Sequence, residues 1–180
     1  MGCPMPSVYF GGSRHWRKIK KSLISQVVSS VISTGQAVRV GCQFGADQAV
    51  ANSATPSSLV VFAVAPILAQ APQHVQQAAA RGARVVLGAG GQSAPMPARY
   101  LLRSIAAFQG CSVAVFFSPG HGSLAVAREA VSQDLQVFAF GDHQPAPIPS
   151  QVGAWVFDFL VIGSQAFPCW SWSPAQLSLF

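Results

Sequence analysis

Three glycine-rich loops follow short apolar runs of the sequence, and loops of this kind can hold a phosphate group. The apolar runs cover residues 8–10, 38–40 and 113–117, and the loops cover 11–14, 41–47 and 118–123. Each loop is followed by a segment with the pattern of a helix. A helix that starts directly after a strand and a glycine turn offers unpaired N–H groups and a positive dipole end to an anion. The order of these elements therefore predicts a site for an anionic ligand.

Arginine and serine side chains near these loops have the chemistry that a phosphate site needs. Arg14 and Arg103 can donate paired hydrogen bonds to phosphate oxygens, and the Ser123 hydroxyl can donate at a helix start. Arg99 precedes Arg103 by four residues on the same helix face and is the alternative candidate. The competing interpretation is that the glycines only form tight turns and that the arginines pair with acidic residues. We favour binding over this interpretation.

The charge balance is consistent with an acidic partner such as a nucleotide or DNA. Eleven Lys and Arg residues against five Asp and Glu residues give a formal net charge of +6. Five basic residues follow the first loop and could line a phosphate site or form a solvated helix face: Arg14, Arg17, Lys18, Lys20 and Lys21. Half of the residues are apolar and only 9% are charged, which fits a buried sheet or a surface for a homo-oligomer.

Apolar runs alternate with helical patterns from residue 8 to residue 140. Strands are expected at residues 8–10, 37–40, 58–65, 84–87, 111–117 and 136–140. Helices are expected at residues 18–33, 46–54, 73–81, 97–109 and 123–132. This alternation predicts an α/β fold, a Rossmann-like doubly wound and mostly parallel sheet of about six or seven strands.

The sequence divides into a predicted domain at residues 1–162 and a predicted tail at residues 163–180. Three prolines between residues 145 and 149 interrupt the alternation, and residues 154–162 are expected to form an edge strand or to cover the sheet. After Gly163 the sequence becomes polar and contains prolines and tryptophans, which is typical of a tail.

Cysteine and histidine spacing predicts neither a metal site nor a disulfide framework. Cys3, Cys42, Cys111 and Cys169 are scattered, and no histidine has ligand spacing with them. The longest apolar stretch is too short to span a bilayer, and no signal peptide is evident at the N-terminus. We therefore expect a soluble cytoplasmic protein with reduced thiols and no membrane contact.

Four short motifs give the chain a resemblance to a known group of proteins. They are Gly-Ser-Arg at 12–14, Gly-Ala-Asp at 45–47, an arginine-bearing helix before the fifth strand, and Gly-x-Gly-Ser at 120–123. In this order they resemble the SLOG superfamily, in particular its YspA-like branch, over about residues 8–141. Its relatives include DNA-processing proteins of the DprA type, phosphoribohydrolases of the LOG type and sensors of nucleotide signals. The resemblance implies a Rossmann-like pocket for a nucleotide at the carboxyl ends of the strands.

Carried over by position, the resemblance also implies the residues of the site. They are Gly11, Gly12, Ser13 and Arg14 in one wall, Gly45, Ala46 and Asp47 in a second, Gly120, Gly122 and Ser123 in a phosphate cradle, and Arg103 opposite the cradle. A bound nucleotide is the ligand or cofactor that this arrangement implies.

The resemblance supports catalysis less well than binding. Phosphoribohydrolases of this group carry a glutamate three residues after the Ser or Thr of the phosphate loop, where this sequence has Val126. Glu129 and Asp47 are the remaining candidates for a catalytic carboxylate. Glu129 is expected rather to pair with Arg128, and Asp47 rather to cap the helix after Gly45. A nucleoside-monophosphate hydrolase is therefore the alternative function.

The last five residues resemble the pentapeptide by which bacterial replication and repair proteins bind the DNA sliding clamp. The segment is Gln176, Leu177, Ser178, Leu179 and Phe180. An extended peptide of this kind inserts its apolar side chains into a pocket of the partner. The competing interpretation is a tail that folds back on its own domain, with Trp170 and Trp172 as anchors.

These observations lead to one main hypothesis and two alternatives. The main hypothesis is an accessory protein that binds a nucleotide or nucleic-acid phosphate and is recruited to the sliding clamp in DNA replication, repair or mobile-element biology. The alternatives are the nucleotide hydrolase and a sensor of a nucleotide signal that changes its oligomeric state.

Overall fold

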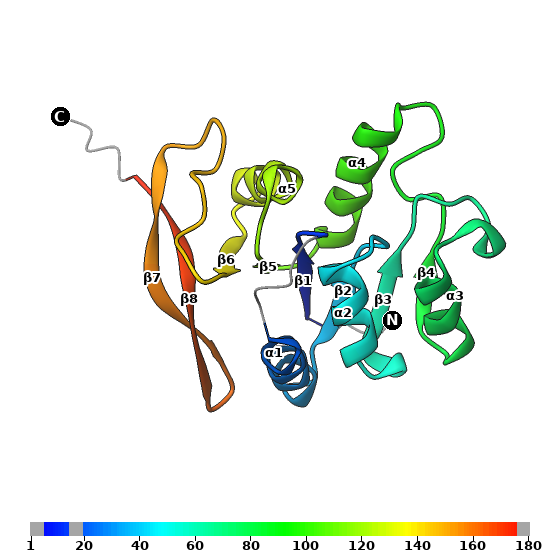
Figure 1. Ribbon diagram of the computed structural model, residues 1–180, viewed down its shortest axis with the longest axis horizontal. Coiled ribbons are helices and arrows are strands. Elements are labelled where there is room, and N and C mark those ends of the chain that lie inside the picture. The colour runs from blue at the N-terminus through cyan, green and yellow to red at the C-terminus, as the bar shows by residue number, and fades with distance from the viewer. Residues whose placement is uncertain (1–5, 15–19, 176–180) are drawn as a thin grey trace.

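An eight-stranded sheet forms the centre of the computed structural model, which describes residues 6–14 and 20–175 (Figure 1). The strand order is β4-β3-β2-β1-β5-β6-β8-β7. The first six strands are parallel: β1 (Ser7–Gly12), β2 (Ala37–Val40), β3 (Leu59–Phe62), β4 (Arg84–Val86), β5 (Val113–Phe117) and β6 (Gln136–Phe140). The last two, β7 (Gly153–Ile162) and β8 (Gln165–Pro174), are antiparallel to their neighbours. The predicted Rossmann-like, mostly parallel sheet is thus confirmed, with eight strands rather than six or seven.

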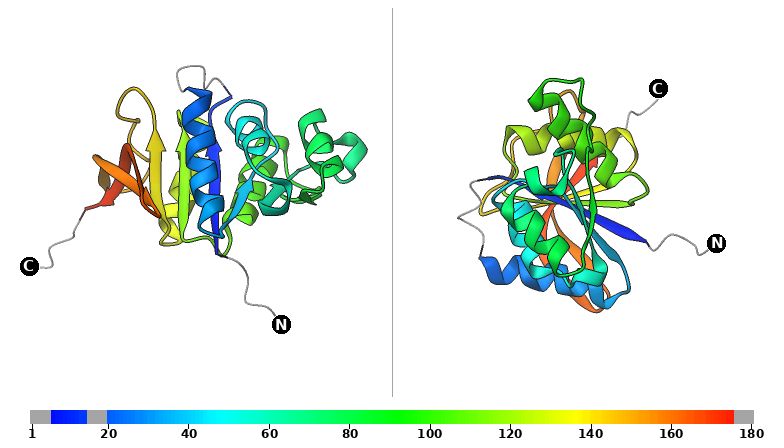
Figure 2. Two further views of the ribbon diagram at one scale, coloured as in Figure 1. Left: turned by 90° about the horizontal axis from the view of Figure 1, so that it is seen from below. Right: turned by 90° about the vertical axis from the view of Figure 1, so that its right-hand side faces the viewer.

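Helices cover both faces of this sheet (Figures 1 and 2). One layer holds α1 (Lys21–Ser33), α2 (Ala46–Ser53) and α3 (Gln73–Ala80), and the other holds α4 (Met96–Phe108) and α5 (His121–Ser132). Two short 3₁₀ helices, η1 (Pro56–Ser58) and η2 (Leu68–Gln70), lie in the connections. Among the described residues, no helix is long and apolar enough to cross a membrane.

Neighbouring residues of the central strands send their side chains to opposite faces of the sheet. In β1, Phe10 packs in the core under α1 and α2, whereas Tyr9 packs in the core under α4 and α5. In β5, Phe117 and Phe116 divide in the same way. Because both faces are buried, these strands consist of continuous apolar runs, and this explains why the sequence pattern located them.

Two helix starts differ from the expected positions. The first helix is described from Lys21 rather than residue 18, and residues 15–19 lie outside the described part. The fifth helix begins at His121 rather than Ser123, so that Gly122 and Ser123 belong to its first turn. This shift matters for the site, because the N–H groups of a first turn have no acceptor within their own helix.

Residues 165–174 are a strand, and the expectation that they belong to a polar tail is wrong. This strand, β8, pairs with β7 over its whole length and with β6 at two positions, and it buries Phe167, Cys169 and Trp172. Its neighbour β7 is the edge strand that the sequence allowed for. Pro168 is tolerated because β8 pairs with β6 only at Trp170 and Ser171, so no ladder hydrogen bond is lost at the proline.

A matched pair of substitutions tests whether β8 completes the core. Phe167 is 6% exposed and Phe157 is 59% exposed in the same hairpin. Phe167→Ala is expected to lower the free energy of unfolding by about 3 kcal/mol, because it leaves a cavity. Phe157→Ala should cost less than about 1 kcal/mol. Urea unfolding followed by tryptophan fluorescence measures both, and equal effects would contradict the described packing.

Candidate functional site

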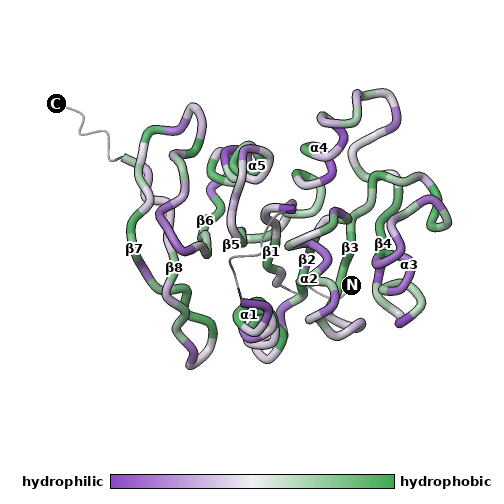
Figure 3. The backbone as a smooth tube through the Cα atoms, in the orientation of Figure 1, coloured by the Kyte–Doolittle hydropathy of each residue, from purple (hydrophilic) through white to green (hydrophobic). Residues whose placement is uncertain are grey.

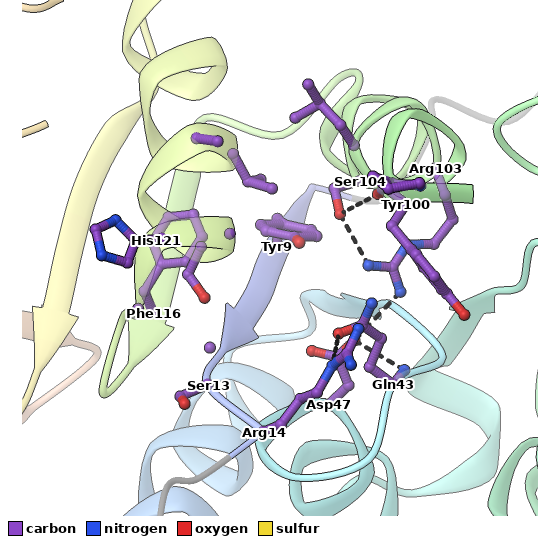
Figure 4. Close-up of a pocket in the computed structure, with 18 residues that line it drawn as sticks. Tyr9, Ser13, Arg14, Gln43, Asp47, Tyr100, Arg103, Ser104, Phe116 and His121 are labelled. Atoms are coloured by element: carbon purple, nitrogen blue, oxygen red, sulfur yellow. Dashed lines mark hydrogen bonds and ion pairs between the residues drawn. The ribbon is translucent and has the colours of Figure 1, made fainter. Parts of the chain in front are cut away.

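A pocket lies at the carboxyl ends of the strands, at the point between β1 and β5 where the strand order reverses. The chain leaves β1 for β2 on one side, and β5 lies on the other side of β1 and continues to β6. Ligands of doubly wound folds bind outside the carboxyl ends of the strands at such a point. Here the loops after β1 and β2, together with α4 and the start of α5, enclose a cavity of about 540 Å³ (Figure 4).

Eight of the eleven residues expected in the ligand site line this cavity. They are Gly12, Ser13, Arg14, Asp47, Arg103, Gly120, Gly122 and Ser123. Gly11, Gly45 and Ala46 are not among the lining residues. Gly11 lies against the rings of Tyr9 and Phe116, and the other two support the first loop from behind.

Backbone hydrogen bonds join the three loops into one frame. The Ser13 N–H donates to the Phe117 carbonyl at 3.0 Å, and the Ala46 N–H donates to the Ser13 carbonyl at 3.1 Å. Gly45 has a φ of +93°, and a Cβ there would lie 2.6 Å from the Ser13 carbonyl oxygen. A Cβ on Gly12 would lie 2.3 Å from the Phe117 carbonyl oxygen. The close approach of the loops therefore requires glycine at both positions.

The N-terminus of α5 faces the cavity without a Cβ in its way. A Cβ on Gly120 or on Gly122 would meet no atom within 4 Å. The first turn of α5 contains no acidic residue, and no side chain caps its N-terminus. Ser123 is the third residue of the helix rather than its cap. The exposed N–H groups and the positive end of the helix dipole are therefore available to an anion.

A buried ion pair forms the floor between α2 and α4. Arg103 Nη1 lies 3.2 Å from Asp47 Oδ2, and the two residues are only 4% and 5% exposed. The Gln43 N–H donates to the same carboxylate oxygen at 3.2 Å, and Arg103 Nη2 donates to the Ser104 hydroxyl at 3.0 Å. Asp47 does not cap α2, which has no side-chain cap. The two charges face each other inside the protein, whereas the buried Nε of Arg103 has no hydrogen-bond partner among the described residues. Arg103 therefore supports the wall of the pocket through its Nη atoms.

Gly41 gives this ion pair the space that it needs. A Cβ at Gly41 would lie 1.7 Å from Arg103 Nη1 and 2.4 Å from Asp47 Oδ2. Any other residue at position 41 would therefore displace the guanidinium group. Gly41 of the second loop therefore serves to make room for the ion pair.

Burial and the ion pair shift the ionisation of three groups. Burial opposes the charge of Arg103, but the nearby Asp47, Tyr9 and Cys42 outweigh it and hold the pKa of Arg103 above its ordinary value. Burial raises the pKa of the Asp47 carboxyl, and the Arg103 guanidinium opposes this rise. Burial also raises the pKa of Tyr9 to about 12, so its phenol remains a neutral hydrogen-bonding group.

Arg14 is the arginine that the cavity leaves accessible. Its side chain is exposed, its Nε donates to Gln43 Oε1 at 2.9 Å, and its guanidinium lies 5.9 Å from the centre of the Tyr100 ring (Figure 4). Arg99, the alternative to Arg103, does not line the cavity. It donates to the carbonyls of Gln92 and Ala94 and holds the loop before α4.

Aromatic residues that the sequence did not single out form much of the remaining wall. Tyr9, Tyr100 and Phe116 line the cavity together with Leu101 and Val126. Tyr9 and Phe116 lie within apolar strands, so nothing in the sequence separates them from core residues. Tyr100 lies between Arg99 and Arg103 on α4, and that position was the signal that could have identified it.

The candidate catalytic carboxylates have other partners. Glu129 Oε1 accepts a hydrogen bond from Arg128 Nη2 at 2.6 Å, as expected, and Glu129 does not line the cavity. Asp47 is engaged by Arg103. Among the described residues, no group of three His, Cys, Asp or Glu side chains could hold a metal ion.

The strand order and the pocket at the switch point define a Rossmann-like α/β protein. Its fold is similar to that of DNA processing protein A from Helicobacter pylori, with a TM-score of 0.64 and 15% identity over 77% of this chain and 66% of that one. It is also similar to DNA processing protein A from Streptococcus pneumoniae, with a TM-score of 0.61 and 18% identity over 81% of this chain and 52% of that one. The expected likeness to DNA-processing proteins is thus confirmed at the level of the fold.

The chain spans about two thirds of one of these structures and about half of the other. No protein-family model matches the sequence, and no curated protein is significantly similar to it.

Two arginine substitutions should separate the supporting role of Arg103 from the exposed position of Arg14. Arg103→Met leaves the Asp47 carboxylate buried without its counter-charge and is expected to lower the free energy of unfolding by about 3 to 5 kcal/mol. Arg14→Met should change it by less than about 0.5 kcal/mol, because the side chain is exposed. Urea unfolding of both variants measures the difference. A stable Arg103→Met variant would show that the ion pair is dispensable.

Proposed function

We propose that the cavity binds a phosphate group of a nucleotide or of single-stranded DNA, and that the chain is a DNA-binding accessory protein. The observation that carries the proposal is the open start of α5, where Gly120 and Gly122 line the cavity and no side chain caps the first turn. Arg14 lines the same cavity and supplies an accessible positive charge. Backbone N–H groups and a guanidinium together form the standard recognition chemistry for phosphate.

The comparison with known structures supports nucleic acid as the source of this phosphate. The structure of DNA processing protein A from Helicobacter pylori was described for its single-stranded DNA binding mode. It shares the Rossmann-like fold of the present chain.

The aromatic wall supports a ligand that carries a base. The Tyr100 ring is partly exposed, and the guanidinium groups of Arg14 and Arg103 lie 5.9 and 5.7 Å from its centre. The rings of Tyr9 and Phe116 also line the cavity but are almost fully buried, so Tyr100 is the ring that offers an accessible surface. Unpaired bases stack on aromatic rings, and each such contact contributes about 1 to 3 kcal/mol. A nucleotide whose phosphate lies at the start of α5 would place its base toward this wall.

The distribution of charge along the chain favours binding of a polyanion at the part of the molecule that contains the pocket. All eleven Lys and Arg residues lie between positions 14 and 128, whereas four of the five acidic residues lie after position 128. The cavity is formed by residues of the basic part. A polyanion is therefore attracted to the half that contains the pocket and not to the β7–β8 hairpin.

Hydrolysis of a nucleotide has less support than binding. The reaction needs a carboxylate that is free to act as a base or nucleophile. Glu129 pairs with Arg128, and Asp47 pairs with Arg103. The same pocket without a free carboxylate suits retention of the ligand, which also leaves a role as a nucleotide sensor.

Binding of a fluorescent single-stranded oligonucleotide, measured by anisotropy, tests this proposal. Arg14→Met is expected to weaken binding by about tenfold or more, since a hydrogen bond to a charged group contributes about 1.5 to 3 kcal/mol. The slope of log affinity against log salt should fall by about 0.7 for the lost phosphate contact.

Arg84→Met is the matched control for this experiment. It removes the same charge from an exposed residue at the amino end of β4, away from the carboxyl ends that form the pocket. Equal losses in the two variants would indicate general attraction to charge. If the protein bound neither the oligonucleotide nor free nucleotides, the proposal would be contradicted.

We further propose that residues 176–180 recruit the chain to a bacterial sliding clamp. These residues lie outside the described part, and their match to the clamp-binding pentapeptide carries the proposal. The described chain supports it at the preceding residues. Pro174 and Ala175 are exposed, and the Ala175 N–H donates to the Val152 carbonyl at 3.0 Å, so the described chain is held to the sheet up to residue 175.

Calorimetry with a purified sliding clamp measures this recruitment. The full chain is expected to bind with a Kd of about 1 μM, which corresponds to about −8 kcal/mol. Truncation after Ala175 and the double substitution Leu179→Ala and Phe180→Ala should both abolish binding, because the apolar anchors are removed. Ser173→Ala, an exposed change on β8, should have no effect. Clamp binding by the truncated chain would contradict the proposal.

A further inference from the structure

The outer side of β7 is a sheet edge without a partner strand among the described residues. β7 is the last strand in the sheet order and pairs only with β8 (Figure 1). It is ten residues long, and Asp158 is its only charged residue. Long apolar edges of this kind pair readily with another strand.

The hydrogen-bond pattern identifies which residues of β7 face this open edge. The Ala175 N–H donates to the Val152 carbonyl, and the register of the two strands continues this pair without a bulge. Hydrogen-bonded pairs alternate along an antiparallel ladder. The backbone N–H and C=O groups of the even-numbered residues of β7 therefore bond to β8, and those of the odd-numbered residues point to the open edge. Two contacts agree: the Trp155 carbonyl accepts from the Gln144 side chain, and the Phe159 N–H donates to Asp158 Oδ1.

The open part of this edge is residues 157–161. At Trp155 the edge is covered by the Gln144 side chain, which belongs to the connection from β6. Beyond that point, the outward residues are Phe157, Phe159 and Val161. Within residues 6–14 and 20–175, the exposed Asp158 carboxylate is the only side chain that bonds to the outward backbone of this segment, so a competing strand can displace it.

The same three residues carry an exposed apolar stripe. Phe157, Phe159 and Val161 are 59%, 51% and 65% exposed. The Phe157 ring packs against the rings of Phe159 and Trp170, with distances of 5.9 and 5.7 Å between the ring centres. Figure 3 shows hydrophobic residues along β7 at the outer side of the sheet. Backbone groups and side chains of one short segment are thus available together.

We propose that this edge binds a second copy of the chain by antiparallel pairing of β7 with β7. A two-fold axis at Phe159 sets Phe159 opposite its own copy and sets Phe157 opposite Val161 of the second copy. Each of these residues has its backbone N–H and C=O groups at the open edge. The groups of the two copies can therefore form a continuous ladder of hydrogen bonds. The two stripes also meet on the same face of the joined sheet. An axis at Phe157 would instead require the Trp155 carbonyl, which Gln144 already occupies.

Charge argues for a second copy rather than for nucleic acid as the occupant. The chain has no Lys or Arg after Arg128, so the hairpin offers no cationic side chain to phosphate groups. Pairing through this end also keeps the basic parts of the two copies apart. The inference does not depend on the function of the pocket, which is formed by other elements.

The area of the edge indicates a dimer of moderate affinity. Each phenylalanine leaves about half of its side chain exposed, on the order of 100 Å². A stable interface buries about 800 Å² on each partner. The stripe supplies less than half of that area, and the ladder must supply the rest. We therefore expect a concentration-dependent dimer with a Kd of about 10 μM.

Sedimentation velocity of the full chain between about 1 and 200 μM, a range that brackets this Kd, tests the proposal. The wild-type chain is expected to shift from monomer to dimer. Phe159→Lys should remain a monomer, because it places two like charges opposite each other. Val161→Pro should also remain a monomer, because it removes an outward N–H and leaves the β7–β8 ladder intact. Circular dichroism and the melting temperature verify that both variants fold.

Ile67→Lys is the matched control, since Ile67 is 52% exposed in the connection after β3 and the charge change is the same. It should dimerise like the wild-type chain, and so should the chain truncated after Ala175. A wild-type chain that is monomeric throughout, or a Val161→Pro variant that still dimerises, would overturn the proposal. Loss of the dimer on truncation would also overturn it, because the edge would then bind the C-terminal segment.

Discussion

The structure depends on the buried pair of Arg103 and Asp47. α2 covers one face of the sheet and α4 covers the other, and this ion pair joins them past the carboxyl ends of the strands. Both groups are almost fully buried, so each charge requires the other, and Gly41 must lack a side chain for them to meet. The pair therefore links the two helical layers at the lining of the cavity.

The pair also determines the character of the site. Because Arg103 and Asp47 neutralise each other, the lining keeps Arg14 as its accessible guanidinium and presents backbone N–H groups at the start of α5. Amides of a helix terminus are fixed in direction and carry partial charges, whereas an arginine side chain is mobile and carries a full charge. If a site of this composition binds the proposed ligand, shape and the partly exposed Tyr100 ring would contribute to its selectivity as well as charge.

The sequence predicted the parallel part of the fold because burial on both faces leaves a clear mark. The strands from β1 to β6 are mostly apolar runs, and the glycine loops after β1, β2 and β5 contribute to the cavity. The hairpin was harder to predict from the sequence, because proline and serine residues lie between the buried Phe167 and Trp172 of β8. The partners of Arg103 and Asp47 could not be predicted either. The two residues are 56 positions apart, and either one could have faced the ligand.

The position of β8 between β6 and β7 has a consequence for the order of folding. β7 is synthesised first, yet it has no place in the sheet until β8 follows and inserts beside β6. The two strands are joined by the short turn at Gly163, so they can form a hairpin as a local unit and attach together. Until then, the side of α1 that Phe167 and Leu160 later cover is open. A nascent chain therefore carries an incomplete core until β8 has been translated, and this is the stage at which chaperones would be needed most.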